Sequence, residues 1–240
     1  MEMANPFKAF MRAVKGSGDP DASLRPSRSA SGSLPAASQA RPTVFPPPHT
    51  RPSAALQQFV RSLDTDKELR LLDLGGANAA NIHFMTQLGP RLYTEDFFAT
   101  LEDCFGDGDY YENQRDPARV DSFLIQTFSE QRGPFDGALV WDCLQFLRPS
   151  LLEKTIDHLH RILEPGAHLL AYFYADSRAE TIPQYHFRIN DEGSLVIAQR
   201  SEMPPGQAFS NRNIERLFED FSSTKFFLSR DNMREVLVRR

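Results

Sequence analysis

Two groups of residues in the first half of the chain have the types and spacing of a ligand-binding site. Asp73 ends the apolar run LRLLDLG, and the glycines Gly75 and Gly76 follow it. Glycines let a ligand approach the backbone, and free N–H groups at the start of the next helix attract an anion. Glu95 and Asp96, roughly twenty residues further on, carry carboxylates that can accept hydrogen bonds from both hydroxyls of a ribose. Together they indicate a site for a ribose-containing ligand.

The elements that must position these residues alternate between short apolar runs and helical patterns. Such alternation predicts βαβ units and a mostly parallel sheet with helices on both faces. The expected helices span residues 53–63, 78–88, 149–163 and 211–221, and the expected strands span 69–75, 91–97, 120–128, 135–142 and 167–176. Two antiparallel hairpins are expected as well, at residues 185–200 and at the end of the chain, 225–240. In a sheet of this kind, ligands bind at the carboxyl ends of the strands, where the glycine loop lies.

Composition divides the chain into two parts. Residues 1–52 are rich in Ser, Pro, Ala and Arg and poor in large apolar residues, which predicts a disordered tail. This tail carries seven Lys/Arg against three Asp/Glu, so an acidic partner is one interpretation and a solvated linker is the other. Residues 53–240 are expected to form one domain, with an insertion at about 177–209.

Charge and cysteine usage exclude several classes of protein. The net charge of −5 gives no general attraction to nucleic acid, and no apolar run is long enough to span a bilayer. The two cysteines, Cys104 and Cys143, form neither a disulfide framework nor a zinc site, and the Asp and His residues lack metal-ligand spacing. We therefore expect no metal, reduced thiols and a cytoplasmic location.

Five segments, taken in order, resemble the class I S-adenosylmethionine-dependent methyltransferases. The family's first motif is an acid followed by glycines at alternate positions, and here Asp73 and Gly75 match while Ala77 and Ala79 stand in the later glycine positions. Its second motif is an acid that ends the next strand, matched best by Asp96. The segments PFDGALVWDCLQFL, LHRILEPGAHLLAYF and the terminal hairpin are similar to the family's later elements. The resemblance covers residues 54–240 and implies a Rossmann-like, doubly wound, seven-stranded sheet with an antiparallel C-terminal hairpin.

The resemblance also implies the positions of the cofactor and the acceptor. S-adenosyl-L-methionine would lie with its methionine end near Asp73, its ribose on Asp96 or Glu95, and its adenine beside Phe97. Asp142 is the candidate general base for a small-molecule acceptor, or else a structural or cofactor-positioning acid. Tyr172, Tyr174 and His186 are candidate lining residues of the acceptor pocket. In full, the cofactor site would comprise Asp73, Gly75, Gly76, Ala77, Asn78, Glu95, Asp96, Phe97, Gln126, Thr127, Phe128 and Trp141.

Two other interpretations of the sequence remain open. The side chains of Ala77 and Ala79 crowd the approach of a ligand, which favours a catalytically inactive binding or assembly module of the same fold. A nicotinamide dehydrogenase would need the pattern G-x-G-x-x-G, and only Gly75 of its three glycines is present, since Ala77 and Ala80 stand in the other positions. Methyl transfer from S-adenosylmethionine to an unidentified small molecule is therefore the leading hypothesis.

Overall fold

A six-stranded sheet forms the centre of the protein, and the computed structural model describes it within residues 45–128, 133–229 and 231–240. Its strands lie in the order β3 (Arg91–Thr94), β2 (Arg70–Asp73), β4 (Phe135–Trp141), β5 (Leu163–Tyr174), β9 (Met233–Arg239) and β8 (Ser223–Leu228). The first four strands are parallel, and β9 and β8 add an antiparallel hairpin at one edge. The predicted α/β fold with a reversed C-terminal hairpin is confirmed.

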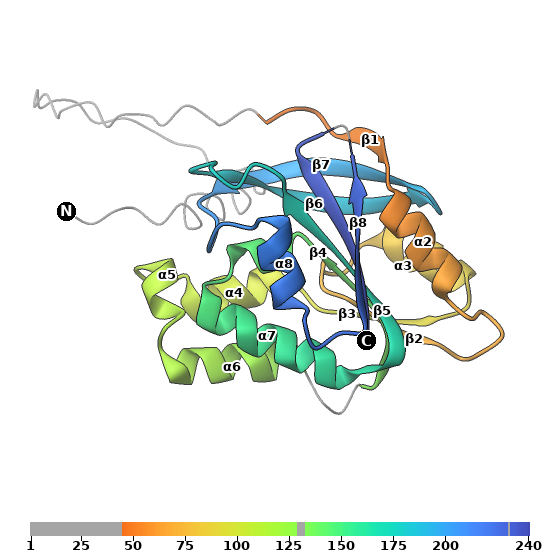
Figure 1. The fold of residues 1–240 in the computed structure, drawn as a ribbon, viewed down its shortest axis with the longest axis horizontal. Helices are drawn as coiled ribbons and strands as arrows, with labels where there is room; N and C mark the ends of the chain where they lie inside the picture. Colours follow the sequence, from red (N-terminus) through yellow and green to blue (C-terminus); the bar gives the residue numbers. More distant parts are fainter. Residues whose placement is uncertain (1–44, 129–132, 230) are drawn as a thin grey trace, which may run out of the picture.

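Helices cover both faces of this sheet (Figure 1). One face carries α4 (Phe97–Phe105), α5 (Tyr110–Asn113), α6 (Pro117–Thr127), α7 (Pro149–Ile162) and α8 (Asn211–Leu217), which share one hydrophobic core. The other face carries α2 (Ala54–Ser62) and α3 (Ala79–Gln87), which pack with a second sheet. A short 3-10 helix, η2 (Cys143–Phe146), follows β4. The arrangement is that of a doubly wound sheet, with its ligand edge at the carboxyl ends of β2, β3, β4 and β5.

The two faces are filled by alternate residues of the central strands, as the period of a β-strand requires. Val140 of β4 and Phe173 of β5 belong to the core under α4–α8. Their neighbours Trp141 and Tyr172 belong to the core under α2, α3 and the second sheet. The large aromatic side chains at the carboxyl ends of β4 and β5 therefore lie on the same side as the second sheet.

This second sheet has three antiparallel strands in the order β1 (His49–Pro52), β7 (Ser194–Met203) and β6 (Ile182–Asp191). Strands β6 and β7 are the predicted hairpin, which lies inside the segment 177–209 expected to be an insertion. Strand β1 corrects the predicted boundary of the tail, because His49–Pro52 pair with Ser194–Ile197 instead of being disordered. The rest of the predicted tail, residues 1–44, lies outside the described residues.

The expected strand at residues 120–128 is wrong, since this segment belongs to helix α6. Its buried residues Val120, Phe123, Leu124 and Thr127 recur at the spacing of a helix, and they pack into the core beside α4. Asp116 caps the helix by accepting a hydrogen bond from the Ala118 N–H, with Pro117 in the first turn. Among the described residues the central sheet therefore has six strands, where seven were expected.

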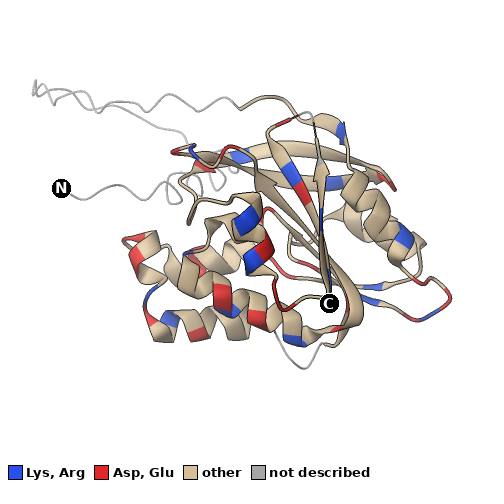
Figure 2. Ribbon diagram, in the orientation of Figure 1, with Lys and Arg blue, Asp and Glu red and all other residues tan. Residues whose placement is uncertain are grey.

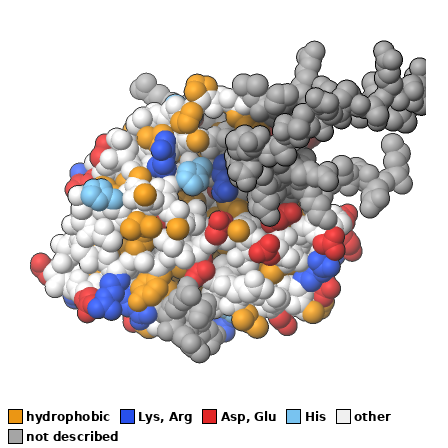
Figure 3. All heavy atoms as spheres, turned by 180° about the vertical axis from the view of Figure 1, so that it is seen from behind, with side chains coloured by type: hydrophobic (Ala, Val, Ile, Leu, Met, Phe, Trp, Pro, Cys, Tyr) orange, Lys and Arg blue, Asp and Glu red, His pale blue; other side chains and the backbone are white. Residues whose placement is uncertain are grey.

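Acidic and basic residues alternate along the ribbons of α6 and α7 (Figure 2), and the visible hydrophobic side chains at the back of the molecule form separate small groups (Figure 3). Ile82 and Ile125 are the exposed large hydrophobic residues within the described ranges. Within the same ranges no helix has the length and apolar character needed to cross a bilayer. A search of these ranges for three or more clustered His, Cys, Asp or Glu side chains able to hold a metal ion finds none.

Candidate active site

The loop between β2 and α3 runs along the end of β3. The backbone N–H of Gly75 donates to the Asp73 carboxylate at 2.8 Å, and that of Gly76 donates to the Glu95 carbonyl at 3.0 Å. Gly76 has a φ of +80°, and a Cβ placed on it would lie 3.3 Å from the Asp96 carboxylate. The backbone of Gly75 and Gly76 thus lies beside the carboxylates of Asp73 and Asp96 at the carboxyl edge of the sheet, where the sequence places them.

The two acids after β3 differ in how they are held. Asp96 is exposed, and its Oδ1 accepts a hydrogen bond from the Ala99 N–H at 3.0 Å, so it caps α4. Glu95 is half-buried, and its carbonyl receives the Gly76 N–H. Asp96 is thus the acid whose carboxylate lies against the glycine loop.

Asn78 joins the loop to the second sheet. Its Oδ1 accepts hydrogen bonds from the N–H groups of Ala80 at 2.9 Å and Asn81 at 3.4 Å, so it caps α3. Its Nδ2 lies 2.9 Å from Nε2 of His186 on β6. Ala77 is exposed, as is Ala79, so neither methyl group is packed into the core beside Asp73.

Trp141 and Asp73 form the closest side-chain contact of the site. The indole Nε1–H donates to Oδ1 of Asp73 at 2.6 Å, and both residues are buried. The indole stacks on Phe187 of β6 at 5.1 Å and on Tyr172 of β5 at 6.1 Å between ring centroids. Burial raises the pKa of the Asp73 carboxyl above its ordinary value, and the donated hydrogen bonds of Trp141, Gly75 and Asn81 act against this rise.

Asp142 lies next to Trp141 at the end of β4 and has one oxygen without a partner. Its Oδ2 accepts a hydrogen bond from the Tyr185 N–H of β6 at 2.8 Å, whereas its buried Oδ1 has no hydrogen-bond partner among the described residues. Burial raises the pKa of Asp142 to about 7, and the Tyr185 hydrogen bond lowers it only in part. A carboxyl group with this pKa can accept a proton near neutral pH.

Asp142 opens onto a narrow recess between β4, β5, β6 and β9, which we call the Asp142 recess. Its lining is mainly aromatic, with one acid, one amide and one thioether. The lining residues are Asp142, Gln145, Tyr172, Phe173, Tyr174, Tyr185 and Met233. Tyr172 and Tyr174 thus line a recess beside Asp142, as expected from the sequence, while His186 lies at the glycine loop beside Asn78 instead.

Four residues predicted for the adenine end of the cofactor lie elsewhere. Phe97 is fully buried and packs edge-on to Phe98 and Phe123, so its ring belongs to the core between α4 and α6. The segment 126–128 was assigned to this site as the end of a strand, but it is the end of helix α6. Phe128 lies beside His158 on α7, close to the start of β5 and away from the carboxyl edge. Gln126, Thr127 and Phe128 were expected at the cofactor because a strand was expected to end there, and the structure has a helix at this position instead.

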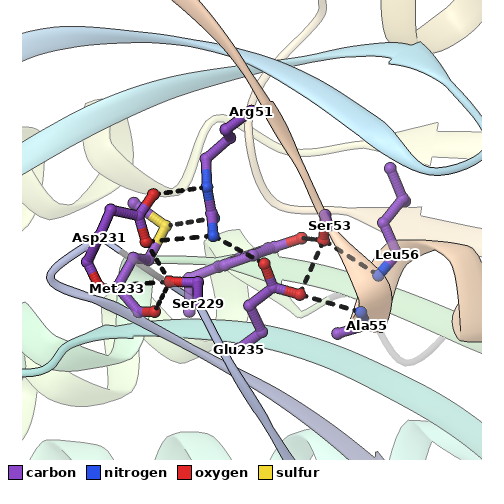
Figure 4. Close-up of polar contacts among 9 residues, drawn as sticks. Arg51, Ser53, Ala55, Leu56, Ser229, Asp231, Met233 and Glu235 are labelled. Atoms are coloured by element: carbon purple, nitrogen blue, oxygen red, sulfur yellow. Dashed lines mark hydrogen bonds and ion pairs between the residues drawn. The ribbon is translucent and has the colours of Figure 1, made fainter.

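A buried polar cluster behind Tyr172 was not predicted from the sequence (Figure 4). Arg51 of β1 forms an ion pair with Glu235 of β9 at 2.7 Å, and both side chains are buried. The other oxygen of Glu235 accepts hydrogen bonds from Ser53 Oγ at 3.0 Å and from the Ala55 N–H at 2.9 Å. Ser53 Oγ also lies 2.8 Å from the Tyr172 hydroxyl. The cluster ties strand β1 to Glu235 of β9 and to Tyr172 of β5, which belongs to the aromatic wall of the site.

Sequence reasoning also missed the residues that join β6 to α3. Asn81 donates through Nδ2 to the Phe187 carbonyl at 3.3 Å and accepts at Oδ1 from the Ile189 N–H at 2.8 Å. Asn78 and Asn81 lie three residues apart, so they share one face of a helix, and this spacing was a usable signal. The burial of Arg51 had no comparable signal, because arginine is usually exposed.

A mostly parallel doubly wound sheet with an acid, a glycine loop and a second acid at its carboxyl edge defines a nucleotide-type ligand site. A family model described as a methyltransferase domain matches residues 48–222. Since this match covers more than half of the chain, the protein belongs to the methyltransferase domain family. The family predicted from the sequence is confirmed, and with it an enzyme that transfers methyl groups.

Solved structures with similar folds include three other methyltransferases. One is 1,6-didemethyltoxoflavin-N1-methyltransferase from Burkholderia thailandensis (14% identity over 78% of this chain and 79% of that chain, TM-score 0.40). Another is human N-acetylserotonin methyltransferase (12% identity over 78% and 52%, TM-score 0.43), of which this chain spans about half the length. The third is the N-methyltransferase NodS from Bradyrhizobium japonicum (16% identity over 77% and 93%, TM-score 0.40). Comparison with curated protein sequences gives no match. The family assignment rests on the family model.

Proposed function

We propose that the protein transfers the methyl group of S-adenosylmethionine to a small molecule whose reacting group lies beside Asp142. The observation that carries this proposal is the meeting of Asp73, the glycine loop and Asp96 at the carboxyl edge of the sheet in a member of the methyltransferase domain family. The site suits the cofactor, because its amino group and its ribose hydroxyls can each donate to an acid, and the glycines let it approach the backbone. When bound, the cofactor supplies a methyl group on a cationic sulfur.

One set of residues would bind the cofactor, and Asp142 would deprotonate the acceptor. Asp73 and the Gly75–Gly76 backbone would hold the methionine end of the cofactor, and Asp96 would hold its ribose. Asp142 Oδ1, which has no partner within the described part of the chain, would accept the proton of an N–H or O–H group on the acceptor. Trp141 and Asp142 are neighbours in the chain, so the residues that hold the cofactor and the proposed base lie next to each other.

Replacement of Asp96, the proposed ligand of the ribose, tests the cofactor-binding part of this proposal. Asp96→Asn removes the charge but keeps an oxygen that can cap α4. We expect its affinity for S-adenosylhomocysteine, measured by calorimetry, to be about ten-fold weaker than wild type, because hydrogen bonds to a charged acceptor are lost.

The matched control is Glu95→Gln, which makes the same exchange one position earlier. We expect this variant to bind within about two-fold of wild type, which is a negligible free energy. The opposite pattern, with Glu95→Gln weakened and Asp96→Asn unchanged, would assign the ribose to Glu95. Equal affinity of all three proteins would reject both acids as ribose ligands.

A further inference from the structure

The indole of Trp141 lies against the bare backbone of the glycine loop. A Cβ built on Gly75 would come within 2.7 Å of the indole Nε1 and within 3.1 Å of Oδ1 of Asp73. The indole edge thus fills the space in which a side chain at position 75 would lie, so it packs directly against the loop. In this structure, the place beside Gly75 and Asp73 is taken by a side chain of the protein itself.

The hydrogen bonds of Asp73 show what a cationic ligand would have to replace. Oδ1 accepts from Trp141 at 2.6 Å and from the Gly75 N–H at 2.8 Å, while Oδ2 lies 3.4 Å from Nδ2 of Asn81. The side chain is fully buried, so no further donor can reach it without displacing one of these three. The Gly75 donor is a backbone N–H, and Asn81 also bonds to β6. Trp141 is therefore the donor that a ligand can displace from Asp73.

The backbone of Trp141 is held in an unfavourable conformation. Its φ is +55°, the left-handed region that a bulky side chain rarely adopts. The surrounding stack holds the residue in this state, with Phe187 contributed by the second sheet and Tyr172 by β5. Residues of this kind concentrate at sites where a conformational change accompanies ligand binding.

We propose that Trp141 is an autoinhibitory residue of the cofactor site: its indole N–H holds the position on Asp73 that the amino group of the cofactor takes, and the cofactor displaces it. This inference rests on the proposed function and adds a step to it. When the indole leaves, its stacking partners Phe187 and Tyr172 are uncovered. The bonds from Asn78 and Asn81 to the Phe187 carbonyl, at 3.4 Å and 3.3 Å, hold β6 in place.

The composition of the chain supplies a direct probe, because Trp141 is its single tryptophan. We would titrate the full-length protein with S-adenosylhomocysteine and record calorimetric heats and tryptophan emission on the same samples. Displacement of a buried, stacked indole is expected to shift its emission to longer wavelength with the same midpoint as the heats. Trp141→Phe keeps an aromatic ring but has no N–H, so this variant should bind S-adenosylhomocysteine about ten-fold more tightly.

A matched control is Phe221→Leu, which also trims a buried aromatic side chain but lies against Phe218 and His160, far from the loop. We expect it to bind like wild type. Binding with unchanged emission, or weaker binding by Trp141→Phe, would overturn the displacement and leave the proposed function standing. Binding by Trp141→Phe alone would support the displacement. Absence of binding by both proteins would overturn the displacement together with the proposed cofactor site.

Discussion

Replacement of Glu235 by alanine is expected to lower the free energy of unfolding by about 3–5 kcal/mol. Glu235 is the acceptor for Arg51, Ser53 and the Ala55 N–H, and it is 2% exposed. Its removal leaves Asp231 as the ion-pair partner of Arg51, itself 4% exposed, and it leaves the Ala55 N–H without its acceptor. Urea unfolding followed by circular dichroism measures the change.

An exposed ion pair provides the control for this prediction. Glu112 pairs with Arg115 at 2.9 Å, and both side chains are well exposed, so Glu112→Ala should cost less than about 1 kcal/mol. The double variant Arg51→Met with Glu235→Leu removes both charges and should regain much of the loss. A cost for Glu235→Ala as small as that of Glu112→Ala would show that the cluster does not anchor β1.

Replacement of Asp142 by asparagine is expected to reduce kcat by about 10²–10⁴-fold, which is the usual contribution of a general base. The loss follows from Oδ1, the buried oxygen with no partner within the described residues, because an amide cannot take up the proton. The acceptor for this assay would come from a screen of small molecules with methyl-labelled S-adenosylmethionine. Affinity for S-adenosylhomocysteine should stay within about two-fold of wild type, since the substitution leaves the glycine loop intact.

The pH dependence of the wild type follows from the same residue. Burial raises the pKa of Asp142 to about 7, and the base acts only when ionised, so kcat/KM should rise with pH through about 7 and then level off. Since this pKa lies above the value of an unfolded chain, ionisation of Asp142 opposes folding at higher pH. Asp142→Asn should therefore have a Tm at pH 8 that equals or exceeds that of wild type.

An exposed acid serves as the control for Asp142. Asp103→Asn, on the solvent side of α4, should leave kcat, the pH profile and the Tm unchanged. A variant Asp142→Asn with full activity, or a wild-type profile without a rise near pH 7, would remove Asp142 from the chemistry and leave it a structural acid.

Strong local patterns in the sequence were enough to predict most of the sheet and the acids at its edge. The run ending in Asp73 and the acids Glu95 and Asp96 each follow a short apolar segment, and the crossover rules then bring them to one edge. The prediction of a strand at residues 120–128 was wrong because a short apolar run does not distinguish a strand from a buried helix. Its helical spacing and the Asp116–Pro117 start are the features that indicate a helix.

The parts of the site that depend on tertiary contacts could not be predicted from sequence patterns. The contact of Trp141 with Asp73 joins residues 68 positions apart, and that of Arg51 with Glu235 joins residues 184 apart. Neither pair has a local signal, since a tryptophan at a strand end is compatible with either face of a sheet. The positive φ of Trp141 is imposed by this packing and runs against its own preference.

The most direct test of the proposed cofactor site is a crystal structure of the protein grown with S-adenosylhomocysteine. We expect density for the ligand along the glycine loop, with its amino group at Asp73, its ribose hydroxyls at Asp96 and the indole of Trp141 moved away from Asp73. Density for the ligand elsewhere, or a loop that still holds only the Trp141 contact at saturating ligand, would contradict the proposal.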